Sequence, residues 1–405
     1  MHSRSLVLLL STLVPALACG TSSGDPTGDP TGEPGTTTGT PDDTGAPTTG
    51  EPEGDLNDRE LGASASPDCL AASPKVAELT QAAAAADAVA ASAAYAGPLQ
   101  TYVQALDAAE ARTDDTEISA WLADGSAPAL TAAAARVHVA LAFRFRAGLA
   151  AVEEGAEDKY AAWDEAHCVY EASVRILAEE ADAATWHTVD ETIAADIAGA
   201  LATGHDAITG DPPATTIDEW RVLPNKQIAE KSLFRAVQRV LVELAGKREA
   251  LAARRARELF AIVEDRLDGR NTPGIQQIKD ILDGDPAAID PDAILTELDL
   301  AFAKRTRRYC TAALDDGEIA TPAGYEGAVE GNTYAKLVLP GMLARVDGAN
   351  AAAYLGDWAA YADLVRTSTD DAAVAGVSGR IAQQTCDYQT ALGVAACTGE
   401  DDETE

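Results

Sequence analysis

Residues 131–146 read TAAAARVHVALAFRFR, and they carry two competing signals. From Val137 to Phe145, apolar residues alternate with other residues, which is typical of a half-buried strand. Four alanines, at 132–135, precede this alternation, and alanine is the strongest helix former. No partner strand is visible elsewhere in the sequence, so an isolated strand would have nothing to pair with. We therefore predict that these residues form a helix.

Helical periodicity extends outward from this stretch over nearly all of the chain between Pro67 and Cys397. Ser73 followed by Pro74 is typical of a helix start, and this first helix is expected to end at the Gly97 break. Gly, Pro and Asp separate the further predicted helices, which cover residues 99–112, 116–123, 128–153, 157–182, 187–207, 225–268, 274–283, 291–314, 325–346, 350–366 and 370–386.

These helices predict an all-α domain over residues 57–398. It is either one large helical bundle or two packed helical subdomains. The loop at 209–224, which contains several prolines, would be the boundary between two subdomains or a long crossover within one bundle.

The charge balance narrows the range of partners. The chain has 405 residues, with 66 acidic against 30 basic side chains and a formal net charge of −36. The resulting field repels nucleic acid and anionic lipid surfaces, so we exclude nucleic-acid binding. The same field attracts cations, so a metal ion or a basic protein is the expected partner.

The first residues have the pattern of a secretory signal peptide. Residues 1–18 begin with His2 and Arg4, continue with an apolar run and are too short to remain as a membrane helix. They lead into Ala-Leu-Ala-Cys, which resembles the lipobox of a lipoprotein, so we predict lipidation of Cys19. Ordinary cleavage near Ala18 is the alternative.

The residues that follow look like a spacer. Residues 19–56 consist mainly of Thr, Gly, Pro and acids, which cannot bury enough surface to fold, so we expect an extended, disordered linker. Residues 399–405 form a second acidic end. Gly20 after Cys19 favours the outer membrane or cell surface, with the domain facing the periplasm or the exterior and the lipid anchor as its membrane contact.

The cysteines indicate an oxidising compartment with an odd thiol. If Cys19 is lipidated, five cysteines remain, and at least one of them is free or pairs between chains. We expect any disulfides to join the ends of the domain, without a defined pairing. The remaining cysteines are Cys69, Cys168, Cys310, Cys386 and Cys397.

Motifs for catalysis are missing from the sequence. There is no Gly-x-Ser-x-Gly, no Walker loop, no His-Glu-x-x-His and no Gly-x-Gly-x-x-Gly after a strand. The acidic residues between Asp283 and Asp292 lack the glycine and glutamate of a calcium loop, so we expect turns and helix caps there. We predict that the chain is not an enzyme.

Two predicted helices carry residues that suit a metal ion. Asp164, His167 and Glu171 are spaced at i, i+3 and i+7, so they share one helix face, and the next helix adds His187 and Glu191 at i and i+4. If the helices pack antiparallel, these five side chains form a mixed oxygen and nitrogen site for iron or zinc. The alternative is a solvated helix face. His138 and His205 are expected to be a core-edge and a helix-end histidine.

Three segments resemble a known family. These are WDEA at 163–166, QIAEKSLFRAVQRVLVEL at 227–244 and EGNTYAKLVLP at 330–340. Together they are similar to the low-iron-inducible periplasmic proteins, the iron-assimilation proteins of algae with bacterial relatives, over about residues 151–386. The resemblance implies a secreted all-helical protein that helps to capture iron at the cell surface, but it carries no ligand motif to transfer.

The sequence thus predicts a cell-surface or periplasmic lipoprotein that binds a cation, iron first of all, for uptake or storage. The alternative is a non-catalytic protein-interaction or scaffold module on a flexible stalk, whose partner the sequence does not identify.

Overall fold

The computed structural model describes residues 59–185, 192–211, 213–394 and 397. The predicted signal peptide, Cys19, the linker up to residue 56 and the acidic tail lie outside these residues. The described chain is all-α apart from one short hairpin, as predicted. Its first helices are α1 (Pro67–Ala84), α2 (Ala88–Tyr95), α3 (Pro98–Glu110), α4 (Asp114–Asp124), α5 (Ala127–Glu153), α6 (Lys159–Val169), a π-helical turn (Tyr170–Val174), α7 (Arg175–Ala183) and α8 (Ile193–His205).

The hairpin pairs β1 (Ile208–Thr209) with β2 (Thr216–Ile217) in antiparallel register. The helices after it are α9 (Glu219–Gly246), α10 (Ala250–Leu259), α11 (Glu264–Leu267), α12 (Thr272–Asp283), α13 (Pro291–Tyr309), α14 (Ala312–Asp315), α15 (Pro322–Arg345), α16 (Ala351–Thr367) and α17 (Asp371–Ala391). Short 3-10 turns lie at Phe260–Ile262 and Pro286–Ala288.

The ambiguous stretch at 131–146 lies within α5, so the helix prediction is confirmed. Ser126 caps α5 by accepting a hydrogen bond from the Ala129 N–H. The helix is buried on almost all sides from Ala132 to Ala142. A helix buried all round needs no single apolar face, which is why its sequence pattern resembled that of a strand.

The long helix α9 begins earlier than predicted, at Glu219 instead of residue 225. Asp218 caps it through the Trp220 N–H, and the helix continues through Pro224. The predicted single helix 225–268 is also wrong, because the chain turns after Gly246, where Arg248 has a positive φ of 54°. Helix starts and stops depend on caps and packing that a periodicity search does not weigh.

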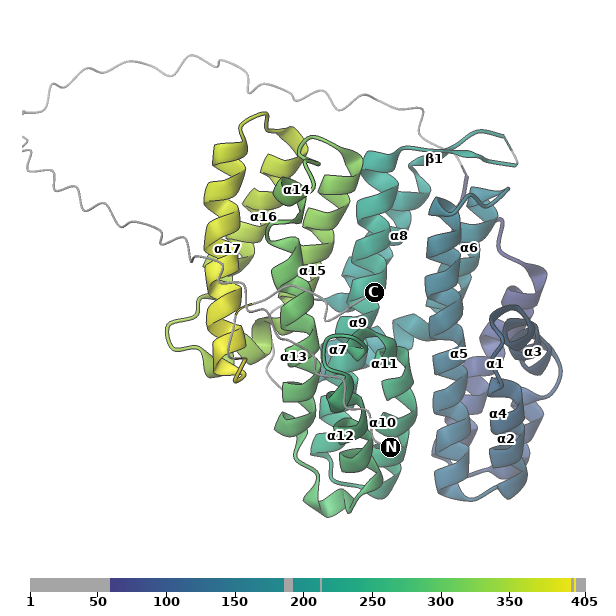
Figure 1. Cartoon of the computed structure of the whole chain (residues 1–405). Coiled ribbons are helices and arrows are strands. Elements are labelled where there is room, and N and C mark those ends of the chain that lie inside the picture. The colour runs from purple at the N-terminus through teal and green to yellow at the C-terminus, as the bar shows by residue number, and fades with distance from the viewer. Residues whose placement is uncertain (1–58, 186–191, 212, 395–396, 398–405) are drawn as a thin grey trace, which may run out of the picture. The chain divides into compact units, whose positions relative to one another are not determined.

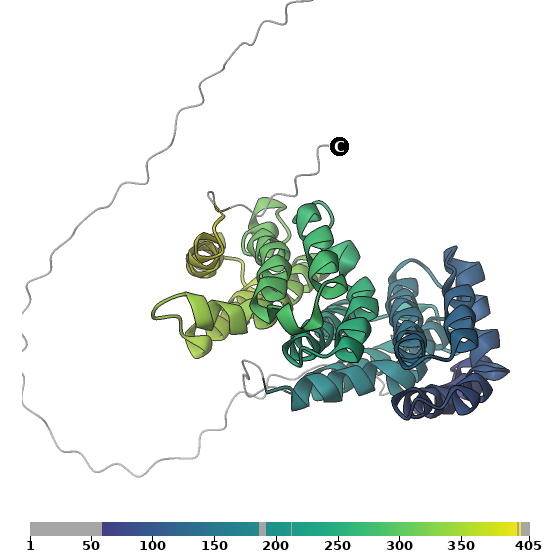
Figure 2. The ribbon, with the colours of Figure 1, turned by 90° about the horizontal axis from the view of Figure 1, so that it is seen from below.

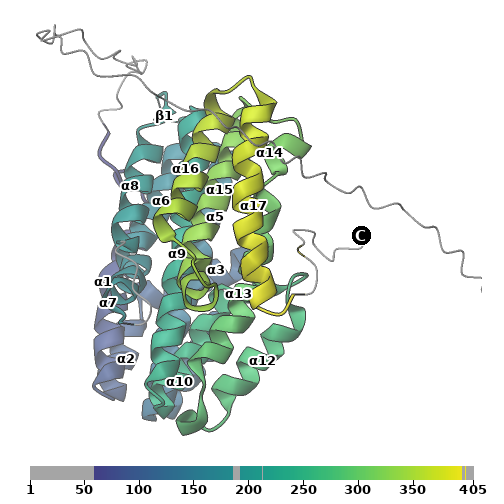
Figure 3. The same ribbon diagram turned by 90° about the vertical axis from the view of Figure 1, so that its left-hand side faces the viewer.

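The helices that precede the hairpin in the chain and those that follow it share one core. The helix α9 packs against α7 and α8, which precede the hairpin in the chain, and against α13 and α15, which follow it. Figure 1 shows α5 and α6 side by side at one side of the domain and α13, α15 and α17 at the other. Figure 2 shows the same order from below, and Figure 3 looks onto α16 and α17. One cluster of buried apolar side chains extends through all of these helices.

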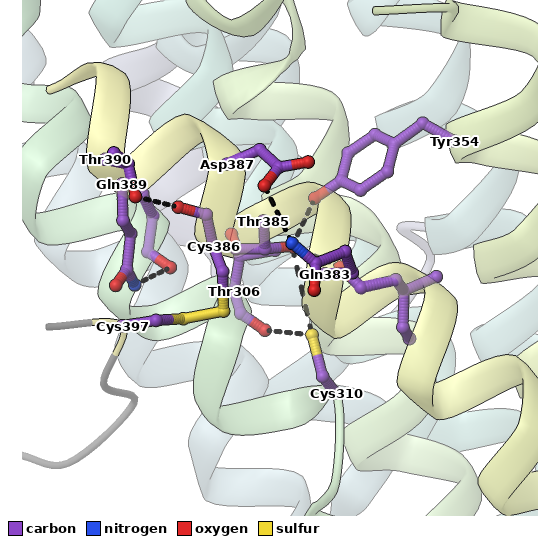
Figure 4. Close-up of a disulfide and its surroundings, with 12 residues drawn as sticks. Thr306, Cys310, Tyr354, Gln383, Thr385, Cys386, Asp387, Gln389, Thr390 and Cys397 are labelled. Carbon is purple, nitrogen blue, oxygen red and sulfur yellow. Dashed lines mark hydrogen bonds between the residues drawn. A yellow bond between two sulfur atoms is a disulfide. The ribbon is translucent and has the colours of Figure 1, made fainter. Parts of the chain in front are cut away.

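Each of two disulfides fastens one end of the domain, and neither joins the two ends to each other. Cys69 on α1 pairs with Cys168 on α6, and Cys386 on α17 pairs with Cys397 (Figure 4). Among the cysteines that the structure describes, Cys310 alone is free. Burial raises the pKa of its thiol to about 12, so it stays protonated and unreactive.

Disulfides of this kind are typical of an oxidising compartment outside the cytoplasm. Among the described helices, none combines the length and the apolar character that crossing a membrane requires.

Candidate functional site

Helices α6 and α8 contact each other where a large side chain packs against a glycine. Trp163 of α6 lies against Gly204 of α8, where an added Cβ would come within 2.1 Å of the indole ring. The indole N–H also donates to the Leu201 carbonyl at 2.8 Å. Because Asp164 follows Trp163 and His205 follows Gly204, this packing places a carboxylate beside an imidazole.

Asp164 and His205 meet in the interior of the domain. Asp164 Oδ1 lies 3.4 Å from His205 Nε2, and both side chains are at most 2% exposed. His205 Nε2 makes no hydrogen bond of normal geometry within the described part of the chain. Burial lowers the pKa of His205, and the nearby Asp164 only partly offsets this, so the imidazole is neutral at pH 7.

His167 lies one helical turn beyond Asp164 and is about one-fifth exposed. Burial lowers its pKa as well, while Glu171 and Asp164 oppose the shift. We call Asp164, His167 and His205 the α6–α8 cluster. Two neutral imidazoles and one carboxylate are a ligand combination that iron and zinc accept.

The segment before α1 covers this cluster. We call residues 59–66 the N-terminal strap. The Gly62 N–H donates to Asp164 Oδ1 at 2.9 Å, and the Ser64 N–H donates to Oδ2 at 2.7 Å. Both oxygens of the buried carboxylate therefore already accept hydrogen bonds from the strap.

Gly62 also lies directly against His167. Its φ of +91° is one that L side chains rarely adopt, and an added Cβ would lie 2.9 Å from His167 Nδ1. The backbone of the strap thus occupies the space in front of this ring nitrogen. The other ring nitrogen, Nε2, faces Glu171 at 4.0 Å.

The five predicted ligands have different outcomes. Asp164 and His167 lie together, as predicted. Glu171 lies 4.0 Å from His167 but pairs with Arg175, whose Nε lies 3.0 Å from its Oε2. His187 and Glu191 lie outside the described residues. In the described part of the chain, no group of three or more His, Cys, Asp and Glu side chains is arranged to hold a metal ion as it stands.

His205 is a partner that the sequence did not indicate. It lies at the end of α8, as predicted, but it also contacts a carboxylate 41 positions earlier in the chain. No local spacing signals such a contact, because it depends on how α8 packs against α6. The contact between Trp163 and Gly204, each one residue before a member of this pair, brings the carboxylate and the imidazole together.

A second histidine lies in a closed part of the core. His138 Nδ1 is 2.7 Å from the Ser173 hydroxyl, and both residues are at most 1% exposed. Burial lowers the pKa of His138 to about 3. A serine and histidine without access to solvent cannot meet a substrate, so this pair is structural. His138 was predicted at the edge of the core and lies inside it.

An acidic cleft of about 350 Å³ lies where α9 and α15 begin. Three carboxylates line it, from Glu153, Glu219 and Glu318, together with the apolar Ile217 and Leu223. The chain already supplies one cation there, because an ammonium group from α9 pairs with Glu153.

Comparisons with known proteins do not extend this picture: no family model, no curated protein and no solved structure matches the chain. The resemblance to the low-iron-inducible periplasmic proteins therefore stays a prediction.

Proposed function

We propose that this chain is a surface-tethered protein that binds a cation at the α6–α8 cluster, with ferrous iron as the best match. One observation carries the proposal: the approach of His205 Nε2 to within 3.4 Å of Asp164 Oδ1, beside His167 on the same helix as Asp164. Two histidines and one carboxylate form the ligand set typical of non-haem iron(II) sites, and zinc accepts it as well.

The protonation states favour such binding. The pKa values of both imidazoles are lowered by burial, so a metal ion would displace no proton from either ring at pH 7. The formal net charge of −36 further raises the cation concentration near the surface.

The proposed location rests on the predicted signal peptide, Cys19 and the acidic linker, and the two disulfides are compatible with it. A lipid-anchored protein of the outer membrane or cell surface would meet cations arriving from outside. We propose binding for uptake or storage, without catalysis.

The test is an anaerobic titration of the mature chain with iron(II), in which calorimetry measures the affinity and the number of bound ions. The wild type is compared with a variant that carries His167→Ala and His205→Ala. A matched control carries Glu219→Gln and Glu318→Gln in the acidic cleft. We expect one ion per chain, with affinity lowered at least about tenfold in the histidine variant and unchanged in the control.

Two results would count against this function. Weak, non-saturating binding that is equal in all three proteins would mean that the acidic surface merely attracts cations. Loss of binding in the cleft variant alone would place the cation between Glu219 and Glu318.

The second candidate is an interaction module on a stalk, and the acidic cleft favours it. Carboxylates beside Ile217 and Leu223 suit the charged head and apolar stem of a lysine or arginine side chain. A basic peptide whose binding is lost with Glu219→Gln and Glu318→Gln, but not with the histidine variant, would support this candidate.

A further inference from the structure

We infer that the N-terminal strap, residues 59–66, competes with the cation for the α6–α8 cluster and must leave Asp164 and His167 before an ion can bind. The inference rests on the proposed function and concerns the regulation of that site. It follows from what the strap contacts.

The strap already occupies the carboxylate. Gly62 and Ser64 donate to the two oxygens of Asp164 at 2.9 and 2.7 Å. Charge-assisted hydrogen bonds to a buried carboxylate are strong. Gly62 donates to Asp164 Oδ1, which is also the oxygen that His205 Nε2 approaches. A metal ion that binds this oxygen from the strap side would have to replace the hydrogen bond from Gly62.

The strap also occupies the space in front of His167. With an added Cβ only 2.9 Å from Nδ1, Gly62 leaves no room for a ligand between its backbone and the ring. A side chain at this position would be excluded both by the φ of +91° and by the ring. The glycine therefore lets the chain close tightly over the imidazole.

A positive charge on the strap lies where a cation would be attracted. The Arg59 guanidinium lies 4.5 Å above the centre of the Tyr160 ring, and that ring packs against His205 with centroids 5.3 Å apart. The closed strap thus supplies a cation of its own next to the cluster.

The end of the strap next to α1 is anchored apart from the cluster, because Ala65 is buried in the core and Ser66 caps α1 through the Cys69 N–H and donates to Glu165 at 3.0 Å. The disulfide from Cys69 to Cys168 holds α1 on α6 immediately after the strap. Residues 59–64, which make the contacts with Asp164 and His167, can therefore leave the cluster while residues 65–66 and α1 keep their places. The strap follows closely after the predicted linker, residues 19–56, so a pull on that linker would reach the strap before the rest of the domain.

The test uses Gly62→Val in the full mature chain. A β-branched residue is strained at this backbone angle and its Cβ collides with His167, so the strap opens while all three cluster residues stay unchanged. The matched control is Gly155→Val, which has a similar φ of +95° but nothing within 4 Å of an added Cβ.

We expect iron(II) to bind Gly62→Val about tenfold more tightly than the wild type, because the open state is already populated. The control should bind like the wild type, and His205→Ala should abolish the gain in the Gly62→Val background. Hydrogen exchange gives a second readout. The amides of residues 62 and 64 should lose protection in Gly62→Val and in the iron-loaded wild type.

The outcomes separate the two proposals. If the wild type binds iron through His167 and His205 but Gly62→Val binds equally or more weakly, the strap orders the ligands instead of competing, and only the inference falls. If neither chain binds iron through the histidines, both proposals fall. Should Gly62→Val not fold, Ser64→Pro removes the donor to Asp164 Oδ2 and must give the same tightening.

Discussion

A buried acid in the second half of the domain should make its stability depend strongly on pH. Asp299 of α13 has no exposed surface. It accepts a hydrogen bond from Gln238 of α9 at 2.7 Å and another from the Tyr388 hydroxyl of α17. Gly341 of α15 closes the site, since an added Cβ would lie 2.1 Å from Asp299 Oδ2.

The pKa of Asp299 is raised to about 7 by burial, with the hydrogen bonds from Tyr388 and Gln238 and the charge of Arg345 opposing the shift. In the unfolded chain the pKa of an aspartate is about 3.9. The folded state therefore holds the proton more tightly. The stabilisation is complete below about pH 4 and is lost as the pH rises towards about 7.

The size of the effect follows from the pKa difference of about three units. At about 1.36 kcal/mol per unit, the free energy of unfolding should fall by up to about 4 kcal/mol between pH 4 and pH 7 because of Asp299. Asp299→Asn keeps the shape of the protonated acid but does not titrate. The free energy of unfolding of the variant relative to that of the wild type should therefore increase steadily as the pH rises from 4 to 7.

Urea unfolding followed by tryptophan fluorescence at pH 4, 5, 6 and 7 measures the difference. Asp363→Asn on the exposed face of α16 serves as the matched control and should show no such trend. A difference between Asp299→Asn and the wild type that stays constant with pH, or that falls as the pH rises, would refute the reasoning.

Two further predictions concern the contacts that build the α6–α8 region. Gly204→Ala should destabilise the domain by about 1–3 kcal/mol because its Cβ meets the Trp163 indole, whereas Gly199→Ala on the same helix has open space and should be neutral or stabilising by up to about 1 kcal/mol. Thermal unfolding compares the two, and equal effects would contradict the packing argument. Replacing Cys69 and Cys168 by serine should cost about 2–5 kcal/mol, since their disulfide closes a loop with a sequence separation of 99. Urea unfolding measures this loss, and an unchanged midpoint would show that the strap and α1 are held without the disulfide.

The fold class was predictable because helices form through local contacts. The alanines before Val137 identified α5 as a helix in spite of an alternating pattern, since hydrogen bonds from i to i−4 need no partner segment. Asp285 and Asp290 were expected to serve turns and caps, and they cap the 3-10 turn and α13. The start of α9 was missed because the prediction began the helix after Pro224, whereas Asp218 caps a helix that continues through this proline.

The candidate site was predictable only in part. Asp164 and His167 could be grouped from their spacing because residues three apart share a helix face. The spacing did not show that the Gly62 and Ser64 amides occupy the same carboxylate, about 100 positions earlier in the chain. It also did not show that Glu171 pairs with Arg175.

The sequence by itself determined the helical class, the acidic surface and the helix that carries Asp164 and His167, because each depends on composition or on neighbours within one turn. Only the tertiary structure decided that Cys69 pairs with Cys168, that His205 completes the cluster and that the strap covers it. These contacts join segments far apart in the chain. Their geometry follows from how whole helices pack, as where Trp163 lies against Gly204, and no spacing along the chain encodes that packing.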